Sequence, residues 1–80
     1  MRLSSDRTDP GFLPALVGPG PRPRFVVTLD GEAVADVVTA DEAEGLVIVR
    51  ARDEVGDLRH RDGVLLREVR RGAVRIERLP

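Results

Sequence analysis

The sequence predicts a mainly β protein: a small antiparallel meander, barrel-like or sandwich-like, with an extended N-terminal arm. Three observations predict this fold. Prolines and glycines crowd the first part of the chain, short β-prone runs fill the rest of its 80 residues, and turn-favouring residues separate those runs. We therefore divide the chain into a Pro/Gly-rich extended arm over residues 1–24 and a compact antiparallel β-domain over residues 25–80.

The arm is defined by its prolines and glycines, which interrupt regular secondary structure. It holds five of the six prolines and three of the eight glycines. Because proline fixes φ and has no N–H to offer a sheet, we expect residues 18–24 to be extended or polyproline-like. One apolar patch over residues 12–17 interrupts the arm. Such an isolated patch either folds back on its own domain or docks on another chain.

The β-domain opens with a predicted hairpin. Residues 25–29 are β-prone, and the dipeptide Asp30-Gly31 follows them directly. This dipeptide is a strong hairpin signal because glycine tolerates the positive φ that a type I′ turn requires. Residues 33–38 are therefore expected to form the returning strand.

An acidic segment over residues 39–45 comes next. Thr39 is a candidate helix N-cap, Glu42 stands three residues later, and Gly45 is a stop signal. The segment predicts either one helical turn or an acidic loop.

The second half of the chain predicts further short strands. The clearest covers residues 46–52, where alternation places Val47, Val49 and Ala51 on one face. After this strand the sequence predicts a turn at 53–57, a possible hairpin continuation at 58–60 and a break at 61–63. A further strand is predicted at 64–70 and a turn at Arg71-Gly72. A closing strand follows at 73–79, with Val74 and Ile76 inward.

The composition argues against catalysis. Cys and Lys are absent, both serines lie in the arm, and no threonine has a candidate base nearby in sequence. We therefore predict no enzyme, no catalytic residue and no cofactor. The only histidine, His60, is flanked by Arg59 and Arg61, which repel cations, and neither acidic run matches an EF-hand loop. No metal site is predicted, and His60 is expected to be an exposed turn residue.

Charge is unevenly distributed around a net value of −1. Residues 25–57 carry two Arg against nine acids, whereas residues 58–80 carry seven Arg against three acids. The C-terminal arginines could neutralise phosphates, but no aromatic stacking platform accompanies them, so we do not expect nucleic acid as a partner. We also expect no signal peptide and no membrane span, because no apolar run approaches the ~20 residues that a span needs.

The core is expected to be marginal. A chain of 80 residues with two Phe, no Trp and no Tyr must build its core from aliphatic side chains. Disulfides are impossible without Cys, so association with another chain is the remaining common way to stabilise so small a domain.

Several short sequence runs, taken together as one pattern, resemble the sequences of a group of small proteins. These proteins are encoded beside the head genes of tailed bacteriophages and gene-transfer particles. The resemblance covers about residues 25–78 and implies a capsid decoration, or cement, protein. Such a protein binds and stabilises the outer surface of the major capsid protein shell, forms a homo-oligomer with a trimer favoured, and is located in the virion. The runs are Val27-Thr28-Leu29-Asp30-Gly31, Val37-Val38, Ala40-Asp41 with Gly45, Val47-Ile48-Val49, Asp53-Glu54 with Gly56-Asp57, and Gly72-Ala73-Val74-Arg75-Ile76.

Under this hypothesis the arm binds the partner. Its apolar patch would enter a groove on a neighbouring subunit while two arginines pair with acids there. The predicted partner-binding residues are Phe12, Leu13, Leu16, Val17, Arg22 and Arg24. The alternatives are a small cellular module, then cytoplasmic, that binds protein or nucleic acid, or a phage head-tail connector or tail component.

Overall fold

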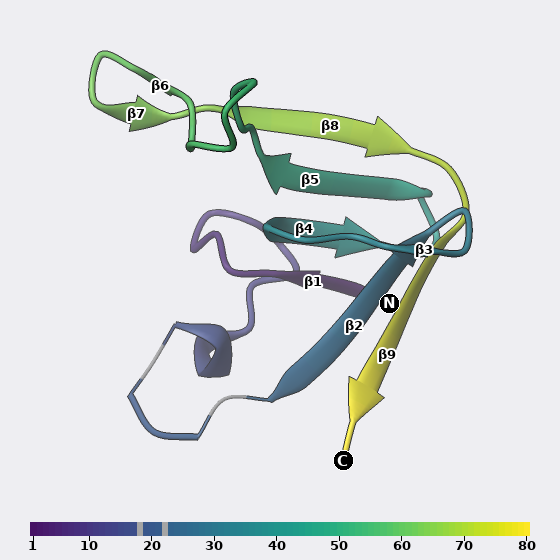
Figure 1. The fold of residues 1–80 in the computed structure, drawn as a ribbon. Coiled ribbons are helices and arrows are strands. Elements are labelled where there is room, and N and C mark those ends of the chain that lie inside the picture. The colour runs from purple at the N-terminus through teal and green to yellow at the C-terminus, as the bar shows by residue number, and fades with distance from the viewer. Residues whose placement is uncertain (18, 22) are drawn as a thin grey trace.

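The computed structural model describes residues 1–17, 19–21 and 23–80. Within these residues the chain forms two antiparallel sheets that pack on each other, together with a separate small hairpin (Figure 1). The predicted mainly β, antiparallel fold is confirmed. The arrangement is sandwich-like and does not close into a barrel, because each sheet ends in strands that have one neighbour among the described strands.

The larger sheet has four strands. Their order is β1 (Arg2–Ser4), β4 (Val37–Asp41), β5 (Leu46–Arg50) and β8 (Arg67–Arg71), and every neighbouring pair is antiparallel. A register shift within β4 brings both Val37 and the later Ala40 opposite the buried valines of β5.

The smaller sheet has three strands in the order β3 (Glu32–Ala33), β2 (Arg24–Leu29) and β9 (Val74–Leu79). A two-stranded hairpin, β6 (His60–Arg61) with β7 (Val64–Leu65), stands apart from both sheets (Figure 1). One short 3₁₀ helix, η1 (Pro14–Leu16), is the only helix among the described residues, and it is too short to cross a membrane.

The core lies between the two sheets and is entirely aliphatic. Its buried centre consists of Val27 from β2, Ala40 from β4, and Val47 and Val49 from β5. Partly buried residues surround this centre: Leu29, Val34, Val37, Val74 and Ile76. The predicted inward faces of β5 and β9 are therefore confirmed.

The predicted turn at Asp30-Gly31 is confirmed, but the returning strand predicted over residues 33–38 is wrong, because β3 covers only Glu32–Ala33 and Val37 already begins β4 of the larger sheet. Asp30 has a φ of 51° and Gly31 a φ of 85°, and Leu29 pairs with Glu32 across them. Two successive positive φ values are what a type I′ turn requires.

The helical turn with Thr39 as N-cap is wrong. Thr39 lies inside strand β4, and its hydroxyl is 2.7 Å from the hydroxyl of Ser4 on the neighbouring strand. Both side chains are buried, so the β-branched threonine satisfies its polar atom across the sheet instead of at a helix start. The acidic segment turns only after Asp41.

An N-terminal arm over the whole of residues 1–24 is not confirmed. Arg2–Ser4 forms an edge strand of the larger sheet, and Leu3 and Ser4 are buried. The guanidinium of Arg2 holds this strand in place by pairing with Asp9 at 2.6 Å and with Asp41 at 3.1 Å. At the other end of the predicted arm, Arg24 already belongs to β2.

Three turns meet where the two sheets join. The Asp30 carboxylate accepts a hydrogen bond from the backbone N–H of Ala73 at 2.9 Å, and the N–H of Gly72 donates to the carbonyl of Gly45 at 3.1 Å. A Cβ at Gly72 would stand 2.7 Å from both carboxylate oxygens of Asp30. With the Asp30 carboxylate in this position, the junction leaves no room for a side chain at position 72.

Candidate protein-binding surface

Three of the six predicted partner-binding residues lie against their own domain. Phe12 bridges Ser4 in parallel, and the N–H of Leu13 donates to the carbonyl of Ser4 at 3.0 Å. Leu16 lines an apolar cavity of about 290 Å³ whose other walls come from both sheets. Phe12, Leu13 and Leu16 are all half-buried. These three residues of the apolar patch therefore fold back on their own domain.

The remaining members of the predicted set differ. Val17 is 39% exposed and Arg24 is exposed at the start of β2. Arg22 lies outside the described residues. The structure therefore does not bring the six predicted residues together as one exposed surface.

A different part of the chain presents exposed apolar side chains. Residues 52–65, here called the distal loops, comprise the turn after β5 and the β6–β7 hairpin, at the end of β5 where β8 begins (Figure 1). Every residue in them is exposed except the half-buried Leu58. Val55 is 81% exposed and Val64 is 64% exposed, the two highest values among the described large apolar residues.

The turn that carries Val55 is held by polar bonds. The Asp53 carboxylate accepts hydrogen bonds from the N–H groups of Val55 and Asp57, each at 3.0 Å, and the Asp53 N–H donates to the Asp57 carbonyl at 2.8 Å. Arg52 donates to the Gly56 carbonyl at 2.6 Å. The turn is thus ordered although its side chains are exposed.

Arg52 also ties this turn to the body of the domain. Its guanidinium pairs with the Asp36 carboxylate through two hydrogen bonds, at 2.6 and 3.0 Å. Such two-point pairing is geometrically specific. The hydrogen bonds from Arg52 lower the pKa of Asp36 below its usual value, and the pKa of Arg52 is raised in return.

The hairpin that carries Val64 is built on a second tight turn. Asp62 has a φ of 51° and Gly63 a φ of 78°, and Arg61 pairs with Val64 across them. The sequence marks this dipeptide as a break. The structure makes it a type I′ turn, by the same rule that applies at Asp30-Gly31.

Three backbone hydrogen bonds anchor the base of the hairpin. The Arg59 N–H donates to the Ala51 carbonyl, the Ala51 N–H donates to the Leu66 carbonyl, and the Leu66 N–H donates to the Arg59 carbonyl, each at 2.9 Å. Ala51 is buried. The distal loops therefore rest on the end of the central strand β5.

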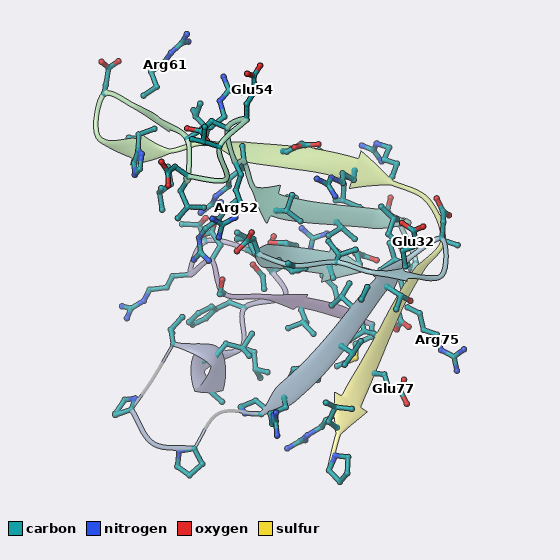
Figure 2. All side chains as sticks on the ribbon, in the orientation of Figure 1. Glu32, Arg52, Glu54, Arg61, Arg75 and Glu77 are labelled. Atoms are coloured by element: carbon teal, nitrogen blue, oxygen red, sulfur yellow. The ribbon has the colours of Figure 1, made fainter. Side chains whose placement is uncertain are left out.

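The distal loops carry charges of both signs as well as the exposed valines. Asp53, Glu54 and Asp57 lie on the turn, whereas Arg59, His60 and Arg61 lie on the hairpin. Figure 2 shows Glu54 and Arg61 pointing away from the ribbon into solvent. Apolar anchors within a polar rim are the usual composition of a protein-binding surface.

Strand β8, next to the distal loops, is basic and exposed along its whole length. Arg67 pairs with Asp6 at 2.6 Å, and Arg70 pairs with Glu68 at 3.1 Å. The hydrogen bond from Arg67 lowers the pKa of Asp6 to about 2. These ion pairs neutralise part of the positive charge that lies near the C-terminus of the sequence.

The described residues contain no group of three or more His, Asp and Glu side chains placed to hold a metal ion. His60 is exposed, as expected, although it lies in strand β6 and not in a turn.

Comparisons with known proteins found no match. No protein-family model matches the chain, no curated protein matches its sequence, and no solved structure matches it.

Proposed function

We propose that the chain is a non-enzymatic structural protein that binds another protein through its distal loops. The observation that carries this proposal is the exposure of Val55 and Val64 on loops that polar bonds hold in place. Apolar side chains in such positions add little to the stability of the isolated domain. Burying them in an interface would remove apolar surface from water, which favours association.

The order of the loops also favours binding. A loop that must be immobilised on contact loses conformational entropy, and this loss weakens the complex. The bonds of Asp53, Arg52 and the Asp62-Gly63 turn fix the loop conformation in advance. Most of the burial free energy is then available for affinity.

The setting that we propose is a virus shell. The resemblance over residues 25–78 implies a capsid decoration protein, whose partner is the major capsid protein and whose location is the virion. The small β-rich domain and the protruding anchors are compatible with attachment to a large, regular surface. In this proposal the distal loops replace the arm as the principal contact, because Phe12, Leu13 and Leu16 are already packed against the domain.

The test uses shells assembled from the major capsid protein of the same genome. The double variant V55S/V64S should sediment with these shells at least tenfold more weakly than the unmodified chain. Each valine that is buried on binding contributes on the order of 1 kcal/mol to the binding free energy, and the double variant loses both contributions. The matched control is Leu79→Ser at the end of β9, which removes a 37% exposed apolar residue on a different surface. It should bind normally.

Three further outcomes would change the proposal. If Val17→Ser weakens binding and V55S/V64S does not, the N-terminal patch is the contact and the distal loops are not. If the chain binds DNA or RNA instead, with an affinity that falls linearly in log salt, a nucleic-acid-binding module replaces the structural protein. If the unmodified chain does not bind the shells at all, the capsid proposal is wrong.

A further inference from the structure

Strand β8 has a neighbour on one side only among the described strands. The hydrogen bonds at its two ends determine which of its backbone groups face outward. The Gly72 N–H bonds the Gly45 carbonyl, and the Ala51 N–H bonds the Leu66 carbonyl. Because bonded and non-bonded pairs alternate in an antiparallel ladder, Glu68 and Arg70 bond to β5. The N–H and C=O groups of Arg67, Val69 and Arg71 therefore point away from the sheet.

The side chains of β8 leave this edge accessible. All five residues of the strand are exposed, and Val69 at its centre is 55% exposed. No residue of β8 belongs to the buried core cluster. An exposed edge of this kind is a template for pairing with another strand.

We propose that the edge pairs with β8 of a second copy of this chain, antiparallel and about a two-fold axis at Val69. Val69 then faces Val69 of the second copy, and Arg67 faces Arg71. These hydrogen-bonded pairs each exchange two backbone bonds. The two four-stranded sheets become one continuous sheet. The inference goes beyond the proposed function, since it uses β8 and not the distal loops.

The charges select this register. Glu68 and Arg70 already pair with each other at 3.1 Å within one chain. On the face that Val47 and Val49 share, the dimer adds a second opposite charge to each of them, because Glu68 lies opposite Arg70 of the second copy and Arg70 lies opposite its Glu68. Opposite charges directly across a strand pair are stabilising, and like charges are destabilising. A slip of the register by two residues in one direction sets Glu68 against Glu68, and a slip in the other sets Arg70 against Arg70. Either slip also loses one of the hydrogen-bonded pairs.

On the other face of the strand pair, like charges oppose the pairing. There Arg67 lies opposite Arg71 of the second copy, twice in the dimer. Arg67 is already paired with Asp6 at 2.6 Å, so the carboxylate offsets its charge. The apolar contact between the two Val69 side chains lies between these pairs. The pairing therefore depends on backbone bonds, the Glu68–Arg70 contacts and Val69.

Cysteine cross-linking tests the register, because the chain has no native Cys. Positions 68 and 70 of opposite copies form a non-hydrogen-bonded pair, with a Cα separation of about 4.5 Å that a disulfide can bridge. An equimolar mixture of Glu68→Cys and Arg70→Cys proteins should oxidise to a covalent heterodimer. Either protein alone should cross-link far less, because its cysteines are diagonal neighbours about 7–8 Å apart. Equal cross-linking in all three samples, or none in the mixture, overturns the register.

Charge reversal supplies the second measurement. In analytical ultracentrifugation the Arg70→Glu variant should raise the dimer Kd by about tenfold, since both contacts become repulsive. The variant E68R/R70E, which exchanges the two charges, should restore dimerisation. The control Glu77→Arg on β9 should leave the dimer Kd unchanged. A wild-type chain that stays monomeric at about 1 mM overturns the proposal, as does a dimer that none of these variants weakens. Because V55S/V64S leaves β8 intact, the capsid proposal can fail while this one stands.

Discussion

Replacing Gly72 by alanine tests the junction of the two sheets. An alanine Cβ would stand 2.7 Å from both carboxylate oxygens of Asp30, which is closer than non-bonded atoms tolerate. The backbone itself is not the obstacle, because Gly72 is absent from the positive-φ residues of the described chain. Asp30 must therefore rotate, and its carboxylate loses the hydrogen bond from the Ala73 N–H at 2.9 Å.

The magnitude follows from three contributions. The lost hydrogen bond costs about 1 kcal/mol of unfolding free energy. Displacing the Asp30 side chain from its rotamer adds about 0.5–1 kcal/mol. The lower entropy of alanine in the unfolded chain returns about 0.5 kcal/mol. We expect Gly72→Ala to destabilise the domain by about 1 kcal/mol, seen in urea unfolding as a lower midpoint at unchanged slope.

Repeating the substitution in an Asp30→Gly variant shows whether the Asp30 carboxylate causes the effect. Asp30→Gly removes it while tolerating the φ of 51° at that position. In this background Gly72→Ala has nothing to displace, and it should stabilise the domain by about 0.5 kcal/mol. The effect of the same substitution thus changes sign. If Gly72→Ala costs the same in both backgrounds, the carboxylate is not what excludes a side chain at position 72 and the reasoning is refuted.

The remaining predictions concern pH and a buried hydroxyl pair. The pKa of Asp6 is lowered from its ordinary 3.8 to about 2 by Arg67, so this pair stabilises the fold above about pH 4 and its contribution disappears as the pH falls toward 2. Acid titration of the unfolding free energy should show this decline, and Arg67→Gln should make it shallower; an unchanged slope would show that the pair does not contribute. Thr39→Val should destabilise the domain by about 1 kcal/mol, because the buried Ser4 hydroxyl loses the Thr39 hydroxyl at 2.7 Å and keeps only the hydrogen bond that it accepts from the Asp6 N–H. Thr39→Ser keeps the hydroxyl and should lose clearly less in the same urea assay, and equal losses for the two variants would contradict this account.

Local signals predict much of this fold. The Asp30-Gly31 turn forms because its dipeptide accepts positive φ whatever the rest of the chain does. The alternation of Val47, Val49 and Ala51 correctly identifies the buried face of the central strand. Both predictions rest on properties of adjacent residues.

The first strand could not be predicted in this way. Arg2–Ser4 is too short to show alternation, and its partners are distant in sequence. Arg2 reaches Asp41, and Ser4 reaches Thr39. The same pairing explains why the N-cap interpretation of Thr39 failed. A hydroxyl that a local pattern assigns to a helix start is used across the sheet instead.

The candidate surface was missed for a related reason. The sequence predicts one strand over residues 64–70, but the structure divides this run into β7 and β8, and Val64 and Val69 are exposed. Whether such a face is buried depends on what packs across it, and the core cluster ends before β8. The sequence signal that was present is Asp62-Gly63, whose turn chemistry places Val64 in a separate hairpin.

The distal loops have a consequence for how this chain can evolve. They contain no buried residue, and their shape depends on Asp53, Arg52 and the glycines of their turns. Substitutions at the other exposed positions leave the aliphatic core untouched and so carry little penalty in folding stability. Related chains are therefore expected to diverge fastest in this segment. New partner specificities can arise there by point mutation, without compensating changes in the framework.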